Sequence, residues 1–207
     1  MSDHDAAMTA ARPTYRPARS EVPDTAIAEW LVTGSKEPEG AFRTWRTGRY
    51  AMVPTGTAFD AVRMPQELVH AAVGSWDPEV VAGALSEILD GPVIRDPDAW
   101  IYALVPPRTT ETWRSPHAVV RGRGAWLAMP RTDLIHPTQS RIYWAVPVDT
   151  VGQLCSPADV ADLLRVGEHR LAYQALLEHA TNCPACTAHR PCRAGDHLRG
   201  AERESRQ

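Results

Sequence analysis

The order of hydrophobic patterns along the chain is the feature that most restricts its fold. Apolar residues at helical spacing occur at 27–31, and short strand-like runs follow at 50–62. Helical patterns return at 65–90, strand-like runs at 93–146, and helical patterns again from 156 onward. Groups of strands separated by groups of helices are typical of α+β domains. We therefore expect a mixed β-sheet with helices packed on one or both of its faces.

Turn residues mark the ends of these elements. Asp77-Pro78 and Ser156-Pro157 each combine a capping side chain with a proline at the first helical position, which predicts two helix starts. Glycine and proline between Gly34 and Gly40 indicate a loop, and Gly122-Arg123-Gly124 is typical of a β-hairpin turn between strands at 118–121 and 125–129.

Length and composition suggest one domain with a small appendage. The 207 residues divide into a tail at 1–23 that is expected to be disordered, an α+β domain at 24–150 and a helical region at 151–207. The 18 prolines argue against long unbroken helices. Three tryptophans lie in strand-like runs, where large aromatic side chains usually pack into the core, although they could also stack on bases: Trp100, Trp126 and Trp144.

The composition also restricts location and partners. No apolar run reaches the roughly 20 residues of a membrane-spanning helix, and the residues from Met1 to Arg19 lack the apolar segment of a secretory signal. We therefore expect a cytoplasmic protein without a membrane partner. The formal net charge of −3 does not indicate a dedicated duplex-binding protein. However, 104–145 contains six arginines and two acids, so one face is expected to be locally positive.

Four residues near the C-terminus have the spacing of metal ligands. His179, Cys183, Cys186 and Cys192 follow the pattern H-x3-C-x2-C-x5-C. A C-x2-C knuckle offers two thiolates from one tight turn, and His179 lies one helical turn before Cys183. Such a closed set of four ligands predicts a structural zinc site rather than a catalytic one.

Alternatives to this ligand set remain open at the level of sequence. His189 and His197 are rival fourth ligands, and Cys183 and Cys186 are also spaced as a redox pair. Free cysteines in a mobile tail are the third interpretation. Cys155 stands apart and is expected to be a small buried apolar residue.

The segment from Tyr50 to Pro147 resembles a known family. The resemblance rests on the run from Met52 to Val62, on Gly91-Pro92-Val93-Ile94 with the strand-like run after it, and on the run from Arg121 to Pro130. Together these resemble the N-terminal domain of bifunctional DNA primase/polymerases (prim-pol), in the diverged form found in high-GC bacteria. The resemblance implies a prim-pol/RRM-like sheet with flanking helices.

The resemblance also implies a catalytic site that this chain has mostly lost. Nucleotidyl transfer uses two divalent ions held by converging carboxylates. Asp60 matches the first family carboxylate, whereas the second carboxylate, the histidine and the third carboxylate fall at or near Val62, Trp100 and Val119. One acid cannot hold two Mg²⁺ ions, so magnesium is expected only if other acids complete the site, for which the candidates are Asp96, Asp98 and Asp133. Without them Asp60 is an ordinary polar residue at a strand edge or in a turn.

The turn at Arg121 and Arg123 is the candidate site for nucleotide or nucleic acid. Glycines at 122 and 124 let the backbone approach a ligand, and guanidinium groups form paired hydrogen bonds with phosphate. Two solvated arginines on a hairpin turn are the simpler alternative.

Three functions follow from these observations. The first is a non-catalytic prim-pol-like protein that binds nucleic acid or nucleotide, or regulates, and carries a structural zinc. The second is an active DNA primase/polymerase, and the third is a zinc-stapled adaptor that binds a protein partner through its C-terminal element. The chain contains no P-loop, dinucleotide-binding, serine-hydrolase or zinc-protease motif.

Overall fold

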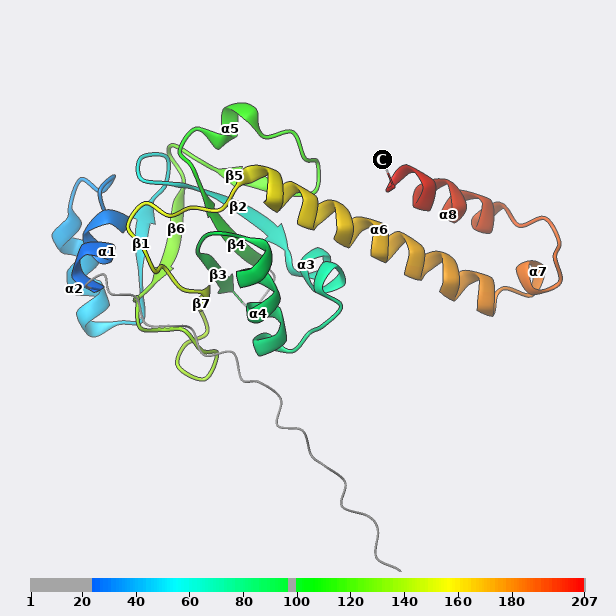
Figure 1. Cartoon of the computed structure of the whole chain (residues 1–207), viewed down its shortest axis with the longest axis horizontal. Coiled ribbons are helices and arrows are strands. Elements are labelled where there is room, and N and C mark those ends of the chain that lie inside the picture. The colour runs from blue at the N-terminus through cyan, green and yellow to red at the C-terminus, as the bar shows by residue number, and fades with distance from the viewer. Residues whose placement is uncertain (1–23, 97–99, 207) are drawn as a thin grey trace, which may run out of the picture.

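The computed structural model describes residues 24–96 and 100–206 of the chain. The predicted disordered tail at 1–23 and the candidate ligand Asp98 lie outside these residues. Within them the chain is an α+β structure with two antiparallel sheets and flanking helices, as the order of hydrophobic patterns predicts (Figure 1).

Helices stand before, between and after the strands. They are α1 (Asp24–Leu31), α2 (Pro38–Thr47), α3 (Gln66–Val73), α4 (Pro78–Ile88), α5 (Thr109–Thr112), α6 (Pro157–Asn182), α7 (Pro184–Thr187) and α8 (Arg193–Glu204). The two predicted caps are confirmed. The Asp77 side chain accepts hydrogen bonds from two backbone N–H groups of α4, and the Ser156 side chain accepts one from the backbone of Asp159.

The larger sheet has five strands and the smaller sheet has two. The five-stranded order is β5-β2-β4-β3-β7, formed by β2 (Asp60–Pro65), β3 (Val93–Asp96), β4 (Trp100–Val105), β5 (Val119–Arg121) and β7 (Tyr143–Val146). The second sheet pairs β1 (Tyr50–Pro54) with β6 (Trp126–Pro130). Every pair in both sheets is antiparallel.

The turn at 122–124 does not form the expected hairpin. β5 pairs with β2, whereas β6 pairs with β1 in the other sheet, so the turn carries the chain from one sheet to the next. Gly124 adopts a φ of 88°, and the N–H of Ala125 donates to the carbonyl of Gly122, which closes this reversal. The expectation of a hairpin was wrong because a turn motif fixes the local reversal but not the strand partners.

The five-stranded sheet is buried on both faces. Val62 and Met64 of β2 lie in one core with α3, α4 and the first turns of α6. Ala61, on the opposite face of the same strand, lies in a second core with α1, α2, β1 and β6. Successive strand residues point to opposite faces, so a strand buried on both sides is apolar at nearly every position.

Helix α6 is longer than the sequence suggested. It runs for 26 residues, and its only proline is Pro157 at the first helical position, where proline does not interrupt hydrogen bonding. Its first turns bury Val160, Leu163 and Leu164 in the core of the five-stranded sheet. Beyond Leu171, which still packs against this core, the helix leaves the body of the protein, and α8 folds back beside it (Figure 1). We call residues 172–206 the C-terminal arm, in which Ala175 is exposed.

The three strand tryptophans have three different environments. Trp144 is fully buried, as expected. Trp100 is half-buried, and the guanidinium of Arg63 lies 4.2 Å from its ring centroid. Trp126 is 58% exposed, so its assignment to the core was wrong. Its strand β6 belongs to a sheet of only two strands, and that sheet has one face open to solvent.

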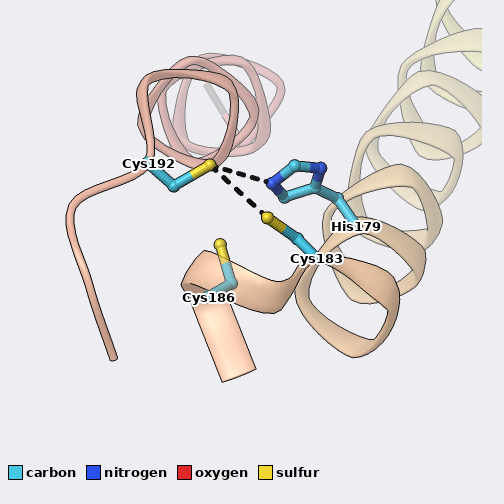
Figure 2. A group of neighbouring side chains, drawn as sticks. All are labelled: His179, Cys183, Cys186 and Cys192. Carbon is cyan, nitrogen blue, oxygen red and sulfur yellow. Dashed lines mark hydrogen bonds between the residues drawn. The ribbon is translucent and has the colours of Figure 1, made fainter. Parts of the chain in front are cut away.

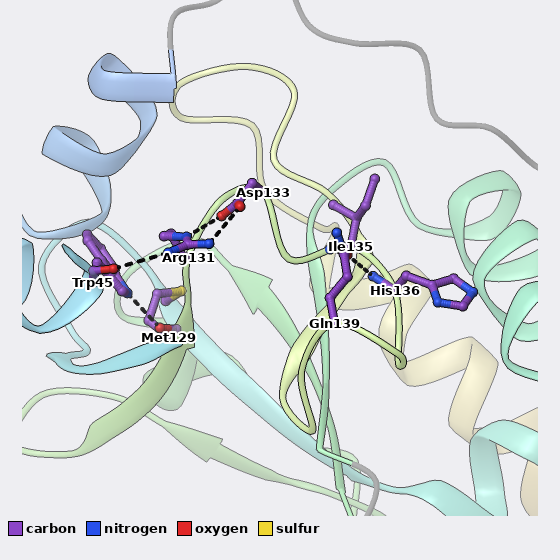
Figure 3. A network of polar contacts seen from close by, with 7 residues as sticks. All are labelled: Trp45, Met129, Arg131, Asp133, Ile135, His136 and Gln139. Carbon is purple, nitrogen blue, oxygen red and sulfur yellow. Dashed lines mark hydrogen bonds and ion pairs between the residues drawn. The ribbon is translucent and has the colours of Figure 1, made fainter. Parts of the chain in front are cut away.

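The start of helix α2 was not predicted from the sequence, because the stretch from Gly34 to Gly40 has the glycines and proline of a loop. It begins at Pro38, inside the predicted loop, and buries Ala41 and Trp45. The indole N–H of Trp45 donates to the carbonyl of Met129 at 3.0 Å, which fixes α2 against β6 (Figure 3).

In the part of the chain that the structure describes, no helix has both the length and the apolar character needed to cross a membrane.

Candidate functional site

Four potential metal ligands meet where the C-terminal arm folds back on itself (Figure 2). His179 lies in the last turn of α6, Cys183 at the end of α6, Cys186 in α7 and Cys192 at the N-cap of α8. One potential ligand atom from each residue lies within 4.8 Å of the other three. Helix α6 therefore extends far enough for His179 to reach the thiols, as the spacing predicts.

The distances between these atoms fit a tetrahedral metal ion. The Sγ atoms of Cys183 and Cys192 are 3.8 Å apart, and Nε2 of His179 is 3.3 Å from Sγ of Cys192. With ordinary zinc–ligand bond lengths, the edges of a tetrahedron are about 3.8 Å between two sulfurs and about 3.6 Å between nitrogen and sulfur. Three thiolates and one imidazole form a donor set that structural zinc sites use. The group could therefore hold a metal such as zinc.

Backbone N–H groups support two of the sulfur atoms. The N–H of Gly195 donates to Sγ of Cys192 at 3.4 Å, and hydrogen bonds from the backbone of Cys186 and Ala185 lower the pKa of the Cys183 thiol. Desolvation and the neighbouring thiols raise the pKa of Cys186 to about 11. Crowded thiols resist joint ionisation, and a bound cation would compensate the charge of the thiolates.

The structure distinguishes among the three candidate histidines. His179 faces the thiols, whereas His189 and His197 are exposed and do not belong to the group. Sequence reasoning also missed Gly195. A Cβ atom at this position would lie 3.0 Å from Sγ of Cys186, so a larger residue would press on the cluster. A glycine three residues after Cys192 is the sequence feature that could have indicated this close approach.

A second set of contacts joins α8 to the middle of α6. Glu202 is only 4% exposed, and its carboxylate accepts a hydrogen bond from Nε of Arg206 at 2.7 Å. Nδ1 of His169 lies 3.2 Å from the hydroxyl oxygen of Ser205 and 3.9 Å from the Glu202 carboxylate. The cluster thus fixes one end of α8 and these polar contacts fix the other.

Cys155 lies away from the cluster and from these contacts. It is buried in the core, as expected, and burial raises the pKa of its thiol to about 12.

Asp60 is buried and supports the start of α5. It is 1% exposed, and its Oδ2 accepts a hydrogen bond from the backbone N–H of Thr110 at 3.3 Å. Desolvation by burial raises the pKa of Asp60. It outweighs the hydrogen bonds that the carboxylate accepts from the backbone of residues 108–110, which lower the pKa. Asp60 is the first residue of β2, where α5 and Gly122 cover its carboxylate.

The described residues do not form a metal-binding group of acids at Asp60. Among the described residues the only group of three or more His, Cys, Asp or Glu side chains placed to hold a metal ion is the one in the C-terminal arm. Asp133 instead forms a two-fold ion pair with Arg131, whose Nη2 donates to it at 2.9 Å (Figure 3). Asp96 lies at the end of β3 opposite Trp100, and Val62 is fully buried.

The two arginines of the turn lie near each other but differ in exposure. Arg123 is exposed, while Arg121 is half-buried in β5 opposite Ala61. Ala61 lies in the core shared with β1 and β6, so Arg121 is on that face of the sheet, and Asp60, one residue earlier, is on the other. The arginines and Asp60 therefore do not converge. Thr55 holds the turn in place through a 2.6 Å hydrogen bond from its hydroxyl to the carbonyl of Gly122.

Comparison with protein families, curated proteins and solved structures found nothing that matches this chain. The resemblance to the prim-pol domain therefore stays a hypothesis based on the residues that suggested it.

Proposed function

We propose that this protein is a non-catalytic, prim-pol-like protein that binds nucleic acid or nucleotide and whose C-terminal arm is fastened by a structural zinc ion. The observation that carries the zinc part of the proposal is the convergence of His179, Cys183, Cys186 and Cys192 on one point. With four protein ligands the ion has no open position for a substrate, so it supplies cross-linking between α6, α7 and α8 rather than chemistry.

The non-catalytic assignment is supported by the surroundings of Asp60. Its carboxylate faces the backbone N–H groups of α5, and Val62 occupies the position where the resemblance requires a second carboxylate. The nucleic-acid role is supported by Arg123, which is exposed on a fixed turn, and by Arg121 beside it. Such guanidinium groups can form paired hydrogen bonds with phosphate oxygens.

The zinc site is tested by measuring metal in the purified protein. Protein prepared without chelator is expected to contain one equivalent of zinc, and a Cys183→Ser/Cys186→Ser double variant is expected to lose it. Cys155→Ala is the matched control because it removes a cysteine outside the cluster. Zinc-free wild-type protein would contradict the site, as would a variant in His189 that loses the metal while His179→Ala retains it.

The nucleic-acid role is tested with a labelled single-stranded oligonucleotide at several salt concentrations. Binding that weakens steeply with salt is expected, since phosphate contacts release counterions, and Arg121→Ala/Arg123→Ala should weaken it. Absence of binding at low salt would favour the protein-interaction adaptor instead. Primer synthesis on a single-stranded template that Asp60→Ala abolishes would overturn the non-catalytic assignment.

A further inference from the structure

An open groove runs between α2 and the exposed face of the two-stranded sheet. Its volume is about 1210 Å³, which exceeds the roughly 300–1,000 Å³ of most small-molecule pockets. Basic side chains line the groove on the α2 side, and large apolar side chains line it on the side of β1 and β6: Lys36, Arg43, Arg46, Tyr50, Met52 and Trp126. The elements α2 and β1 that line it lie at the end of the molecule opposite the C-terminal arm (Figure 1).

The apolar side chains of the groove are exposed because the strands alternate. Ala51 is buried in the core, whereas its neighbours Tyr50 and Met52 are 48% and 52% exposed. Met52 pairs with Ala128, two residues from Trp126 on the same face of β6, so Met52 and Trp126 are diagonal neighbours. Three large apolar side chains on one open sheet face are typical of a binding surface.

The charge of the groove is positive although the chain carries a net charge of −3. Lys36, Arg43 and Arg46 are all exposed, and none forms an ion pair with another described residue. Glu37 is the acid among the lining residues, so their net charge is +2. The three basic groups are therefore available to an anionic partner.

A smaller hollow continues the groove across the sheet. It shares Met52 and Trp126 with the groove and adds Tyr102 and Arg121, together with Asp96. The indole of Trp126 thus lies between the basic residues on the α2 side and Arg121, which the proposed function treats as a phosphate contact. The surface therefore leads from the basic wall on the α2 side across Trp126 to Arg121.

We propose that this groove binds single-stranded nucleic acid, with unpaired bases stacked on Trp126 and Tyr50 and phosphates beside Lys36, Arg43 and Arg46. The inference rests on the proposed function. It specifies that the nucleic acid is single-stranded and that this groove is the surface that binds it. Grooves that combine a basic wall with aromatic platforms hold single strands, because every unpaired base offers a π-face for stacking. A duplex keeps its bases stacked within the helix and cannot use these platforms.

The test measures the fluorescence anisotropy of a labelled thymidine oligonucleotide with the full-length protein. Trp126→Ala and Tyr50→Ala are each expected to weaken binding about 5- to 150-fold, the range that loss of one stacked base gives. Both side chains are exposed, so the fold does not depend on them. Trp76→Ala is the matched control, because Trp76 is 64% exposed between α3 and α4 and should leave affinity unchanged.

The basic wall is tested separately through the salt dependence. An Arg43→Gln/Arg46→Gln variant should bind more weakly and lower the slope of log affinity against log salt by about 0.7 for each phosphate that the protein no longer neutralises. Arg165→Gln removes a positive charge from α6, away from the groove, and should leave the slope unchanged. A poly-glutamate peptide of equal charge should bind at least about tenfold more weakly than the oligonucleotide, because it offers no bases for stacking.

The outcomes separate this inference from the proposed function. Oligonucleotide binding that survives the Trp126 and Tyr50 variants, but is lost on Arg121→Ala/Arg123→Ala, overturns the groove and leaves the proposed function standing. Equal affinity for a duplex of the same length, or for poly-glutamate, also overturns the groove as a single-strand site. Absence of binding to any nucleic acid at low salt overturns both.

Discussion

Replacing Gly167 by alanine should destabilise the protein, although alanine is the better helix former. Gly167 lies where α6 crosses α3, and a Cβ atom there would be 2.1 Å from the carbonyl oxygen of Leu68 and 2.8 Å from its carbonyl carbon. Both neighbours are backbone atoms, so the overlap is relieved only by separating the two helices and loosening the core between them. Overpacking of this kind costs about 1–3 kcal/mol, and we expect a value near the upper end.

A second glycine provides a control of opposite sign. Gly83 lies inside α4, and a Cβ atom at this position would meet no atom within 4 Å. Gly83→Ala should therefore raise the free energy of unfolding by about 1 kcal/mol, the helix-propensity difference. In Gly167→Ala the same gain offsets only part of the overpacking cost, so the free energy of unfolding should fall by about 2 kcal/mol. Urea unfolding of both variants, with the midpoint as the observable, measures the difference. Equal shifts of both midpoints, or a stabilised Gly167→Ala, would refute the close crossing of α3 and α6.

Two further predictions concern buried polar groups. Burial, together with the Arg95 guanidinium, lowers the pKa of His70 to about 4. The unfolded chain, with a histidine pKa near 6.5, then binds more protons below that pH, so stability is full above about pH 6.5 and falls by about 2 kcal/mol at pH 5. Urea midpoints against pH measure this loss, and His70→Gln should flatten the curve; an unchanged slope would be inconsistent with a buried neutral imidazole. Asp60→Ala removes the acceptor at the start of α5 and should cost about 1–3 kcal/mol, while Asp60→Asn keeps an acceptor oxygen and should cost clearly less in the same assay; equal losses would argue against this capping role.

The C-terminal cluster is the site that could be predicted best from sequence. All four ligands lie within 14 residues, so a helix end, one tight turn and a short loop are enough to bring His179, Cys183, Cys186 and Cys192 together. Such local geometry depends little on the rest of the fold. The choice of His179 over His189 was harder, because it required α6 to continue to residue 182, and the abundance of prolines suggested shorter helices.

Sites built from distant strands could not be predicted in the same way. The groove joins α2 to β6, whose residues are about 80 positions apart, and Trp126 lies on the open face of the sheet that β6 forms with β1 rather than with β5. The family resemblance likewise suggested Asp60 as a possible metal ligand, and only the tertiary structure shows that α5 covers it.

The sequence alone determined the helix caps at Asp77 and Ser156, the α+β class and the metal-ligand spacing, because each depends on neighbours within a few residues. Only the tertiary structure decided which strands pair, which face of each sheet stays open and which polar groups are buried. These properties depend on contacts between residues far apart in the chain, and a local pattern of apolar residues is compatible with several such pairings.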